Sequence, residues 1–282
     1  MGVNGRDPTV LVTGATDGLG RRVAGELAGA GATVLVHGRD RGRLQRTLDE
    51  IRDATGNERL RSYLADFSSL DEVRRLAEAV EGEEPRLDVL VNNAGIGAGA
   101  RGDRERALSL DGFELRFQVN YLAGFLLTRL LLPLLRRSAP ARIVNVASAG
   151  QSPLDFDDLM LERRYDGRRA YGQSKLAQVM FTFELAERLD PAEVTVNVLH
   201  PASLMNTKMV FESFGSAMTT VEEGAEATLR LALWPELDRV TGRYFDGLRE
   251  ALANAQAYDP DARRQLWQRS EELTSLSPAA SL

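Results

Sequence analysis

The sequence predicts a single α/β domain in which helices cover both faces of a parallel, doubly wound sheet of seven strands. The first observation is that strand-length apolar runs alternate with helix-length segments along most of the 282 residues. The second is that glycine-rich or polar motifs directly follow several of these runs, at the carboxyl ends where such sheets bind ligands. The expected strands are residues 9–13, 33–37, 60–65, 87–91, 142–146, 194–199 and 242–245.

The composition is that of a soluble globular protein. The chain is 43% hydrophobic with a net charge of −6, so it lacks the overall basic field that nucleic-acid binding requires. It has no cysteine, and its only histidines are His37 and His200, so no metal site is expected. No run approaches the ~18 to 20 apolar residues of a membrane span. We therefore expect a cytoplasmic protein that does not bind membranes, with its domain over residues 9–274 and flexible ends at 1–8 and 275–282.

The first expected strand leads into a glycine-rich turn and then a helix over residues 21–29. The turn reads Gly14-Ala-Thr-Asp-Gly18-Leu-Gly20. Glycines allow a tight bend and let backbone N–H groups approach a pyrophosphate, whose charge a helix N-terminus stabilises. A tight connection without a ligand is the alternative interpretation of this motif alone.

The second expected strand ends in Gly38-Arg39-Asp40, without an acidic residue where a ribose 2′-hydroxyl would be bound. A guanidinium at this strand end suits a 2′-phosphate, so Arg39 predicts NADP(H) in preference to NAD(H). Asp40 is an alternative partner for Arg39 or Arg43. A helix is expected over residues 41–54.

The third and fourth expected strands also end in polar residues. Asp66 can accept a hydrogen bond from an adenine amino group or, with Ser68 and Ser69, cap the helix expected over residues 70–80. Both roles are compatible. The fourth strand is followed by Asn92-Asn93-Ala94-Gly95, whose small residues and amides allow a flat ring to approach the backbone.

Asn120 and Ser148 are candidate site residues, although each could also have a purely structural role. A long helix is expected over residues 111–137, and Asn120 interrupts its apolar stretch, so its amide needs partners in the core or in a site. Ser148 follows the fifth strand and is otherwise a turn residue. Between Ser148 and Tyr171 lie 22 residues, with a short helix expected over 157–163.

Tyr171 and Lys175 lie four residues apart at the start of an expected helix that continues to about residue 188. Residues at this spacing share one helical face, so the phenol and the ammonium can point into one cleft. A neighbouring ammonium favours the phenolate and lowers the tyrosine pKa, which makes the pair a candidate acid/base device. Tyrosine and lysine at this spacing also occur on exposed helices. The pair alone therefore does not distinguish an active site from an ordinary helix surface.

The sixth strand ends in His200-Pro201-Ala202-Ser203, where a packed histidine is favoured over a catalyst. Residues 204–220 are apolar but poorly periodic, which indicates a substrate flap suited to a lipophilic substrate, or else a core helix. Further helices are expected over residues 221–234 and 260–273.

In this order, the motifs resemble the short-chain dehydrogenase/reductase family over residues 10–245, and the resemblance implies a Rossmann fold. The matching motifs are Thr13-Gly14-x-x-x-Gly18-x-Gly20, Asp66, Asn92-Asn93-Ala94-Gly95, Asn120, Ser148, Tyr171-x-x-x-Lys175 and Pro201. Within the family, Gly38-Arg39-Asp40 and Tyr171-Gly-Gln-Ser-Lys-Leu176 are most similar to the branch of retinol dehydrogenases and protochlorophyllide reductases.

The resemblance implies a role for each matching residue. Tyr171 would exchange a proton with the substrate oxygen, and Lys175 would lower the Tyr171 pKa and hold the nicotinamide ribose. Ser148 would hydrogen-bond the substrate oxygen, and Asn120 would anchor a proton-relay water through its backbone or amide. The cofactor would be bound by Gly14, Thr16, Asp17, Gly18, Leu19, Gly20, Arg39, Asp66, Phe67, Asn93, Ala94, Gly95, Tyr171, Lys175, Pro201, Ser203 and Thr207.

We therefore expect an NADP(H)-dependent oxidoreductase that acts on a lipophilic or secondary-metabolite ketone or secondary alcohol. An epimerase or dehydratase with the same cofactor, or a non-catalytic NADP sensor, is the alternative. The resemblance also implies a homodimer or homotetramer formed through the helices near Asn120 and Tyr171.

Three departures from the family pattern qualify these expectations. Asp17 stands where many NADP-preferring members are basic, and Ala202-Ser203 follow Pro201 where a glycine is common. The membrane anchors frequent in retinoid-active members are not visible, which argues against retinol as the substrate.

Overall fold

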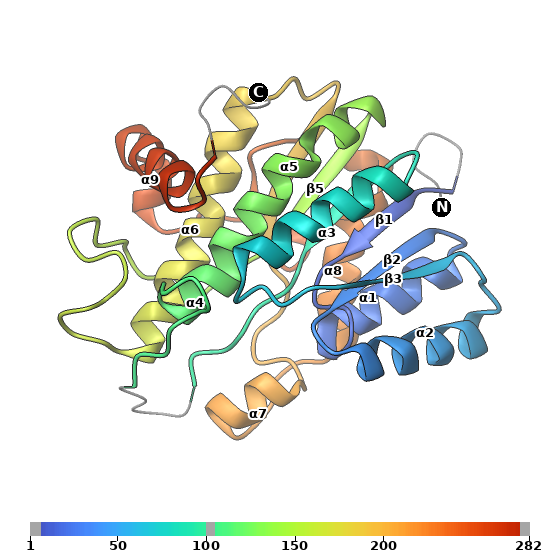
Figure 1. Cartoon of the computed structure of the whole chain (residues 1–282), viewed down its shortest axis with the longest axis horizontal. Helices are drawn as coiled ribbons and strands as arrows, with labels where there is room; N and C mark the ends of the chain where they lie inside the picture. Colours follow the sequence, from blue (N-terminus) through green and yellow to red (C-terminus); the bar gives the residue numbers. More distant parts are fainter. Residues whose placement is uncertain (1–6, 100–104, 277–282) are drawn as a thin grey trace.

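The computed structural model of the chain describes residues 7–99 and 105–276 (Figure 1). The predicted flexible ends, 1–8 and 275–282, lie mostly outside these residues. The described residues form one eight-stranded sheet in the order β3-β2-β1-β4-β5-β6-β7-β8. The strands are β1 (Thr9–Val12), β2 (Thr33–Gly38), β3 (Leu60–Leu64), β4 (Val89–Asn92), β5 (Ala141–Val146), β6 (Val194–His200), β7 (Tyr244–Asp246) and β8 (Arg249–Glu250).

The parallel, doubly wound sheet is confirmed, but the predicted count of seven strands is wrong. β1 to β7 pair in parallel, whereas β8 pairs antiparallel with β7. β8 is two residues long and exposed, so it has neither the length nor the apolar pattern that marks a buried strand. It follows β7 through a turn at Gly247, whose φ of +56° suits glycine.

Helices cover both faces of the sheet, as predicted (Figure 1). α1 (Gly18–Gly29), α2 (Arg41–Thr55) and α8 (Val221–Leu233) pack on one face, with α1 against α2 and α8. α3 (Leu70–Glu83), α5 (Ala123–Arg137) and α6 (Gly167–Arg188) pack on the other. The remaining helical segments are α4 (Leu115–Phe117), a π-helix at Gln118–Leu122, α7 (Lys208–Phe214), 3₁₀ turns at Pro235–Leu237 and Ala255–Tyr258, and α9 (Pro260–Leu273).

The strand β1 shows how the sequence pattern separates the two cores. Val10 and Val12 point to the side of α1 and α8, and Leu11 points to the side of α3 and α5. All three side chains are fully buried. A central parallel strand is covered on both faces, which explains why its sequence is a continuous apolar run.

Two helix predictions were wrong in detail. The helix expected over residues 111–137 begins at Leu115 and passes through the π-helix Gln118–Leu122, which surrounds Asn120. π turns are uncommon and are found frequently at functional sites. The short helix expected over 157–163 is absent, because residues 156–160 form turns and the Asp158 carboxylate accepts from the backbone N–H groups of Glu162 and Arg163 instead.

Within the described chain, the helical run Leu115–Arg137 is the single helix long and apolar enough to cross a membrane by length and composition. The expectation that no run approaches the length and composition of a membrane span is wrong for this helix. In the fold, 78% of its most apolar window is buried, which is the pattern of a core helix.

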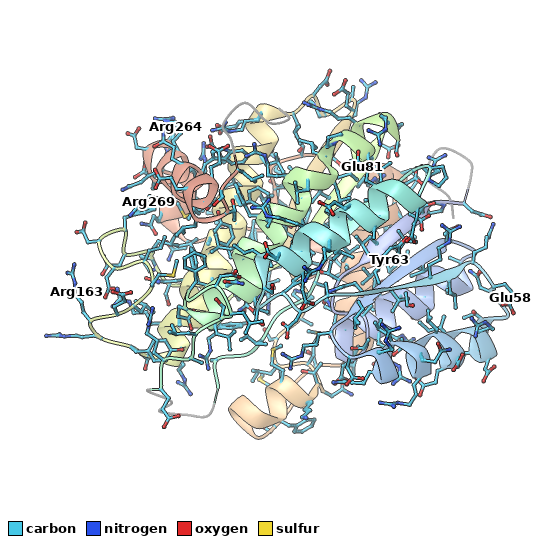
Figure 2. The ribbon with its side chains drawn as sticks, in the orientation of Figure 1. Glu58, Tyr63, Glu81, Arg163, Arg264 and Arg269 are labelled. Atoms are coloured by element: carbon cyan, nitrogen blue, oxygen red, sulfur yellow. The ribbon has the colours of Figure 1, made fainter. Side chains whose placement is uncertain are left out.

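α9 packs against α6 and closes the core on that side (Figure 1). Trp267 is 3% exposed, stacks on Phe181 of α6 and meets Phe125 of α5 edge to face. Arg129 of α5 is 1% exposed and forms an ion pair of 2.8 Å with Glu271 of α9. Arg264 and Arg269 lie on the outer face of the same helix (Figure 2).

Candidate active site

Tyr171 and Lys175 lie in the second and third turns of α6, near its start as predicted. The helix begins after Asp166, whose carboxylate caps it by accepting from the Arg169 backbone N–H at 2.8 Å. The Lys175 ammonium lies 5.8 Å from the centroid of the Tyr171 ring. It donates to the Val146 carbonyl at 3.0 Å and to Gln178 Oε1 at 2.9 Å.

Ser148 lies beside Tyr171 at the carboxyl end of β5. A hydrogen bond from the Ser148 side chain lowers the pKa of Tyr171 and so opposes the effect of burial. Gly150 lies close to both residues. A Cβ added to it would lie 3.5 Å from Ser148 Oγ and 3.8 Å from Tyr171 Cε1. The structure thus brings the hydroxyl and the phenol together from segments that are 22 residues apart.

Burial shifts the pKa values of both Tyr171 and Lys175. Burial raises the pKa of Tyr171 above its usual value of 10.0, and it outweighs the hydrogen bond from Ser148. Burial also lowers the pKa of Lys175 to about 7, since a charged ammonium loses its hydration there. Burial and the hydrogen bond from Ser148 account for the direction of the Tyr171 pKa, and the lowering of this pKa by Lys175 stays a prediction.

The Asn120 side chain is fully engaged in holding the loop after β4. Its Oδ1 accepts from the Ile96 N–H at 2.8 Å, and its Nδ2 donates to the Ile96 carbonyl at 3.1 Å. Nδ2 also donates to Ser174 Oγ at 2.9 Å, and Ser174 in turn donates to the Tyr171 carbonyl at 2.7 Å. Asn120 was expected to anchor a proton-relay water through either its backbone or its side-chain amide. Because the amide already has these partners, the backbone remains available for that role.

The glycine-rich turn between β1 and α1 packs closely against the loop after β4. Gly14 and Gly18 have φ values of +65° and +47°, which favour glycine. A Cβ on Gly14 would lie 2.8 Å from Ala94 Cα, and one on Gly20 would lie 2.4 Å from Asn93 Nδ2. Any side chain at Gly14 or Gly20 would collide with the wall of the turn, so glycine is required for this close packing. The Gly14 N–H donates to His37, which leaves the later N–H groups at the α1 N-terminus as the candidates for binding an anion.

Asn93 and Ala94 build this wall from the other side. Asn93 Nδ2 donates to the Thr13 and Gly14 carbonyls at 2.9 and 3.2 Å. Thr13 Oγ1 accepts from the backbone N–H groups of Asn93 and Ala94. Gly95 continues toward the acid/base pair, because a Cβ there would lie 3.2 Å from Asn120 Oδ1 and 3.6 Å from Lys175 Nζ.

Asp17 and Asp40 both cap helices, which leaves Arg39 exposed. Asp17 accepts from the Gly18 N–H at 2.8 Å and pairs with Arg43 at 2.7 Å. Asp40 Oδ1 accepts from the Arg43 backbone N–H at 2.7 Å, and among the described residues no ion pair joins Asp40 to Arg39. Among the residues described, Arg39 has no hydrogen bond or ion pair. Its guanidinium is therefore available to a phosphate.

Asp66 and Phe67 lie at the end of β3, as predicted. Asp66 Oδ1 accepts from the Ser68 N–H at 2.9 Å, while Ser69 is the residue that caps α3. The carboxylate thus shapes the turn and keeps further acceptor capacity for an adenine amino group.

His37 is a residue of this site that sequence inspection missed. Its Nδ1 accepts from the Gly14 N–H at 3.1 Å, and its Nε2 donates to the Ala65 carbonyl at 3.0 Å. The ring stacks on Phe67 with centroids 4.4 Å apart. It therefore joins the pyrophosphate turn to the end of β3. The sequence shows only a histidine at the end of an apolar strand. This pattern does not predict a site residue, because the residues that bind the imidazole are distant in the sequence.

The His37 contacts predict a pH-dependent stability. Burial lowers the pKa of His37 from 6.5 to about 4, although Ala65 and Asp66 favour the charged form. Between these values the unfolded chain binds a proton that the native chain does not, so stability falls as the pH falls. We expect His37 to contribute about 2 kcal/mol to the loss of unfolding free energy between pH 7 and pH 5, by urea denaturation.

A His37→Asn variant is the matched control for this loss, since it retains every other titratable group. Its unfolding free energy should fall less between pH 7 and pH 5 than that of the wild-type chain. Equal losses in the two proteins would contradict a buried neutral imidazole.

The segment after β6 brings Pro201, Ser203 and Thr207 to the same edge. Ser203 Oγ lies 3.1 Å from His200 Nε2, and the Ser203 carbonyl accepts from Thr219. Thr207 caps α7, and its Cγ2 would lie 3.2 Å from a Cβ on Gly18. Thr207 thus contacts the pyrophosphate turn.

The predicted substrate flap, residues 204–220, is neither a core helix nor a simple loop. A bridge between Met205 and Thr219 closes its base, and it carries α7, which stands apart from the sheet (Figure 1). Met209, Phe211 and Met218 are exposed.

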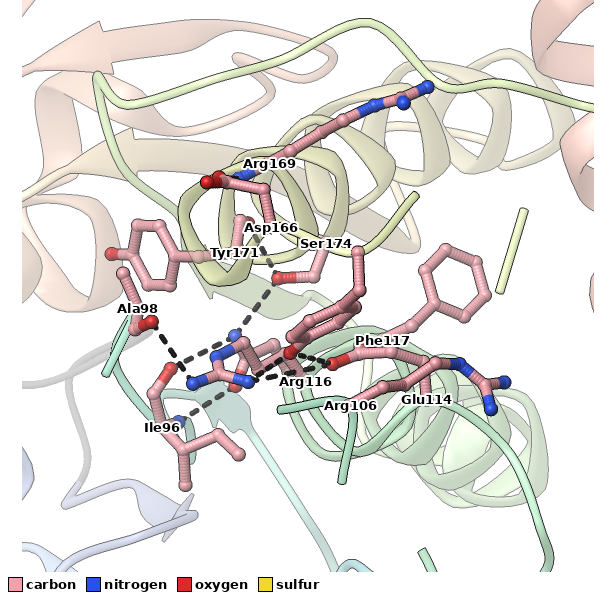
Figure 3. Close-up of polar contacts among 12 residues, drawn as sticks. Ile96, Ala98, Arg106, Glu114, Arg116, Phe117, Asp166, Arg169, Tyr171 and Ser174 are labelled. Atoms are coloured by element: carbon pink, nitrogen blue, oxygen red, sulfur yellow. Dashed lines mark hydrogen bonds and ion pairs between the residues drawn. The ribbon is translucent and has the colours of Figure 1, made fainter. Parts of the chain in front are cut away.

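A second feature missed in the sequence is the buried Arg116 beside the site (Figure 3). Its guanidinium donates to the carbonyls of Gly97 and Ala98 at 2.9 and 3.0 Å, and to the Tyr165 hydroxyl. Glu114 accepts from Tyr165 at 3.0 Å. This cluster joins the loop after β4 to the segment before Tyr171.

The comparison with family models agrees with this geometry, since residues 8–215 match the model described as short chain dehydrogenase. The chain is a short-chain dehydrogenase/reductase. Retinol dehydrogenase 13 of Mus musculus is 40% identical over 288 residues, covering 96% of this chain and 85% of the relative. The branch suggested by the sequence motifs is thereby confirmed.

Solved structures of other short-chain dehydrogenases share the fold of this one. A short chain dehydrogenase from Shigella flexneri complexed with NADP has a TM-score of 0.72 and 27% identity, covering 86% of this chain and 98% of that chain. A 3-ketoacyl-(acyl-carrier-protein) reductase from Brucella melitensis complexed with NADH has a TM-score of 0.68 and 26% identity, covering 85% and 96%. The family therefore supports a nicotinamide cofactor for this dehydrogenase.

Proposed function

We propose that the chain is an NADP(H)-dependent oxidoreductase that interconverts a lipophilic ketone and its secondary alcohol. The observation that carries this proposal is the position of Tyr171. Its phenol lies against Ser148 and above Lys175, at the same sheet edge as the pyrophosphate turn. A proton donor, an oxygen-binding hydroxyl and a cofactor cradle are the parts that carbonyl reduction requires.

The family resemblance implies the roles of these residues, and their contacts support them. Tyr171 would give its proton to the substrate oxygen during reduction and take it back during oxidation. Ser148 would donate a hydrogen bond to the same oxygen and stabilise its developing charge. The nicotinamide, when bound, supplies or accepts the hydride.

The cofactor would lie along the glycine-rich turn. Its pyrophosphate would accept from backbone N–H groups at the α1 N-terminus, and Gly14, Gly18 and Gly20 allow the turn to pack tightly there. Leu19 and Thr16 belong to the same segment, and Asp66 and Phe67 would border the adenine.

The preference for NADP(H) is assigned to Arg39, the exposed guanidinium at the end of β2. We expect Arg39→Ala to weaken NADPH binding by about 10- to 100-fold, since hydrogen bonds to charged groups contribute about 1.5–3 kcal/mol. NADH binding should change little, because NADH has no 2′-phosphate. Fluorescence titration of each cofactor measures both constants.

Arg264→Ala is the control for this variant, because it removes the same charge from the outer face of α9 (Figure 2). It should bind both cofactors as the wild type does. Equal weakening of NADPH and NADH by Arg39→Ala would remove the basis for the cofactor preference.

The proposal of a lipophilic substrate is based on the exposed apolar residues of the flap, 204–220, and on the names of the relatives. Exposed Met209, Phe211 and Met218 suit an apolar substrate, and the curated relatives are named retinol dehydrogenases. The test is a panel of ketones, aldehydes including retinal, and alcohols, read by NADPH absorbance. Reduction of at least one carbonyl compound is expected. Cofactor binding without turnover would instead favour a sensor, and conversion without net NADPH use would favour an epimerase or dehydratase.

A homodimer or homotetramer and a cytoplasmic location are also proposed. Because α9 packs on α6, subunits that meet at the helices near Asn120 and Tyr171 would contact each other through α9. Light scattering and cell fractionation test the two proposals.

A further inference from the structure

Lys175 is a buried ammonium held by two neutral oxygens. The residue is 5% exposed, and its Nζ donates to the Val146 carbonyl and to Gln178 Oε1. Across the described part of the chain, no carboxylate forms an ion pair with it. The titratable groups that face it are Tyr171 on its own helix and His200 at the end of β6.

An ammonium in such a place loses its hydration without gaining a counter-ion. Burial lowers the pKa of Lys175 to about 7, so the charged form is only partly favoured at neutral pH. Hydrogen bonds to the charged form work in the opposite direction. The two oxygens that accept from Nζ therefore help to decide whether Lys175 carries its charge.

Gln178 is well placed for this task. It is 4% exposed and lies three residues after Lys175, on the same face of α6. Its backbone carbonyl accepts from Thr182 Oγ1 at 2.8 Å, and Thr182 accepts from Asn145 Nδ2 at 2.8 Å. These bonds fix the turn of α6 that carries Gln178 against β5.

We propose that Gln178 is a positioning residue whose Oε1 orients the Lys175 ammonium and keeps it charged in the acid/base site. This inference rests on the proposed function. An ammonium has three N–H donors, and Val146 and Gln178 accept from two of them. The third is then left for a ribose hydroxyl of the nicotinamide cofactor.

The composition of the chain allows a direct test in the cofactor-free protein. Lys175 and Lys208 are the only two lysines, so protein labelled with ¹³C-lysine gives two side-chain signals by NMR. Lys175→Arg assigns the signals, and the exposed Lys208 serves as the internal reference. The titration midpoint of Lys175 is the quantity to compare among variants.

Two substitutions of Gln178 should move this midpoint in opposite directions. Gln178→Met keeps the length of the side chain but removes the acceptor, and we expect a midpoint about one pH unit lower. Gln178→Glu places a carboxylate beside the ammonium, and we expect a midpoint at least about one pH unit higher. The pH above which kcat falls should shift the same way in each variant.

Thr182→Val is the control for general loosening of this helix turn, since it removes a hydrogen bond to the Gln178 backbone but leaves the side chains of Gln178 and Lys175 unchanged. It should lower the melting temperature and leave the Lys175 midpoint unchanged. The inference is overturned if Gln178→Met and Gln178→Glu both titrate like the wild type. If the midpoints move as expected but no carbonyl compound is reduced, the role of Gln178 stands and the proposed reaction fails.

Discussion

Tyr171→Phe is expected to lower kcat by about 10²- to 10⁴-fold, the range typical for loss of a general acid. The substitution removes one oxygen and leaves the ring in place, so the packing beside Ser148 and Lys175 should survive. NADPH affinity should therefore stay within a few-fold of the wild-type value. Turnover with the best carbonyl substrate and fluorescence titration of NADPH measure the two quantities separately.

Tyr258→Phe is the matched control for this loss, because it makes the same atomic change at an exposed tyrosine. The hydroxyl of Tyr258 accepts from the Ala253 N–H, and among the described residues it forms no hydrogen bond with a residue of the site. Its kcat should equal that of the wild type. If Tyr171→Phe kept most of its turnover while binding NADPH, Tyr171 would not be the proton donor.

Trp267→Ala is expected to lower the free energy of unfolding by about 3–5 kcal/mol, the usual cost of a large buried aromatic. The indole is buried between α9, α5 and α6, and the guanidinium carbons of Arg129 and Arg188 lie 4.7 and 4.1 Å from its ring centroid. Truncation would leave a cavity and remove both cation–π contacts. Urea denaturation at fixed pH measures the loss.

Arg264→Ala on the outer face of α9 should change the same free energy by less than about 0.5 kcal/mol. The side chain is 53% exposed and contacts Asp261 within its own helix. A Trp267→Ala protein as stable as Arg264→Ala would contradict the packing described for α9.

Most of the fold could be predicted because its strands are buried on both faces and read as short apolar runs between helices. The positions of the glycine-rich turn, Asp66, Asn93 and Ser148 were predictable for a related reason, since each of them follows a strand closely. Tyr171 and Lys175 lie in α6 and were expected instead from their four-residue spacing and the family resemblance. β8 could not be found, because an exposed pair of residues leaves no apolar pattern. The π-helix around Asn120 was equally hidden, since its sequence is compatible with a regular α-helix.

The hydrogen bonds within the site were harder to predict than the residues that form it. His37 binds Gly14 and Ala65, and Arg116 binds Gly97 and Ala98, so their roles depend on residues brought together by the fold. The burial that raises the Tyr171 pKa could not be predicted, because sequence spacing reports the neighbouring charge but not the degree of burial.

The docking of α9 also bears on how the chain folds during synthesis. Phe125 and Phe181 are made long before Trp267, which covers them in the finished protein. Until α9 has left the ribosome, the nascent chain would present an aromatic surface on the outside of α5 and α6. Chaperones that recognise exposed aromatic side chains would have their best opportunity to bind during that interval.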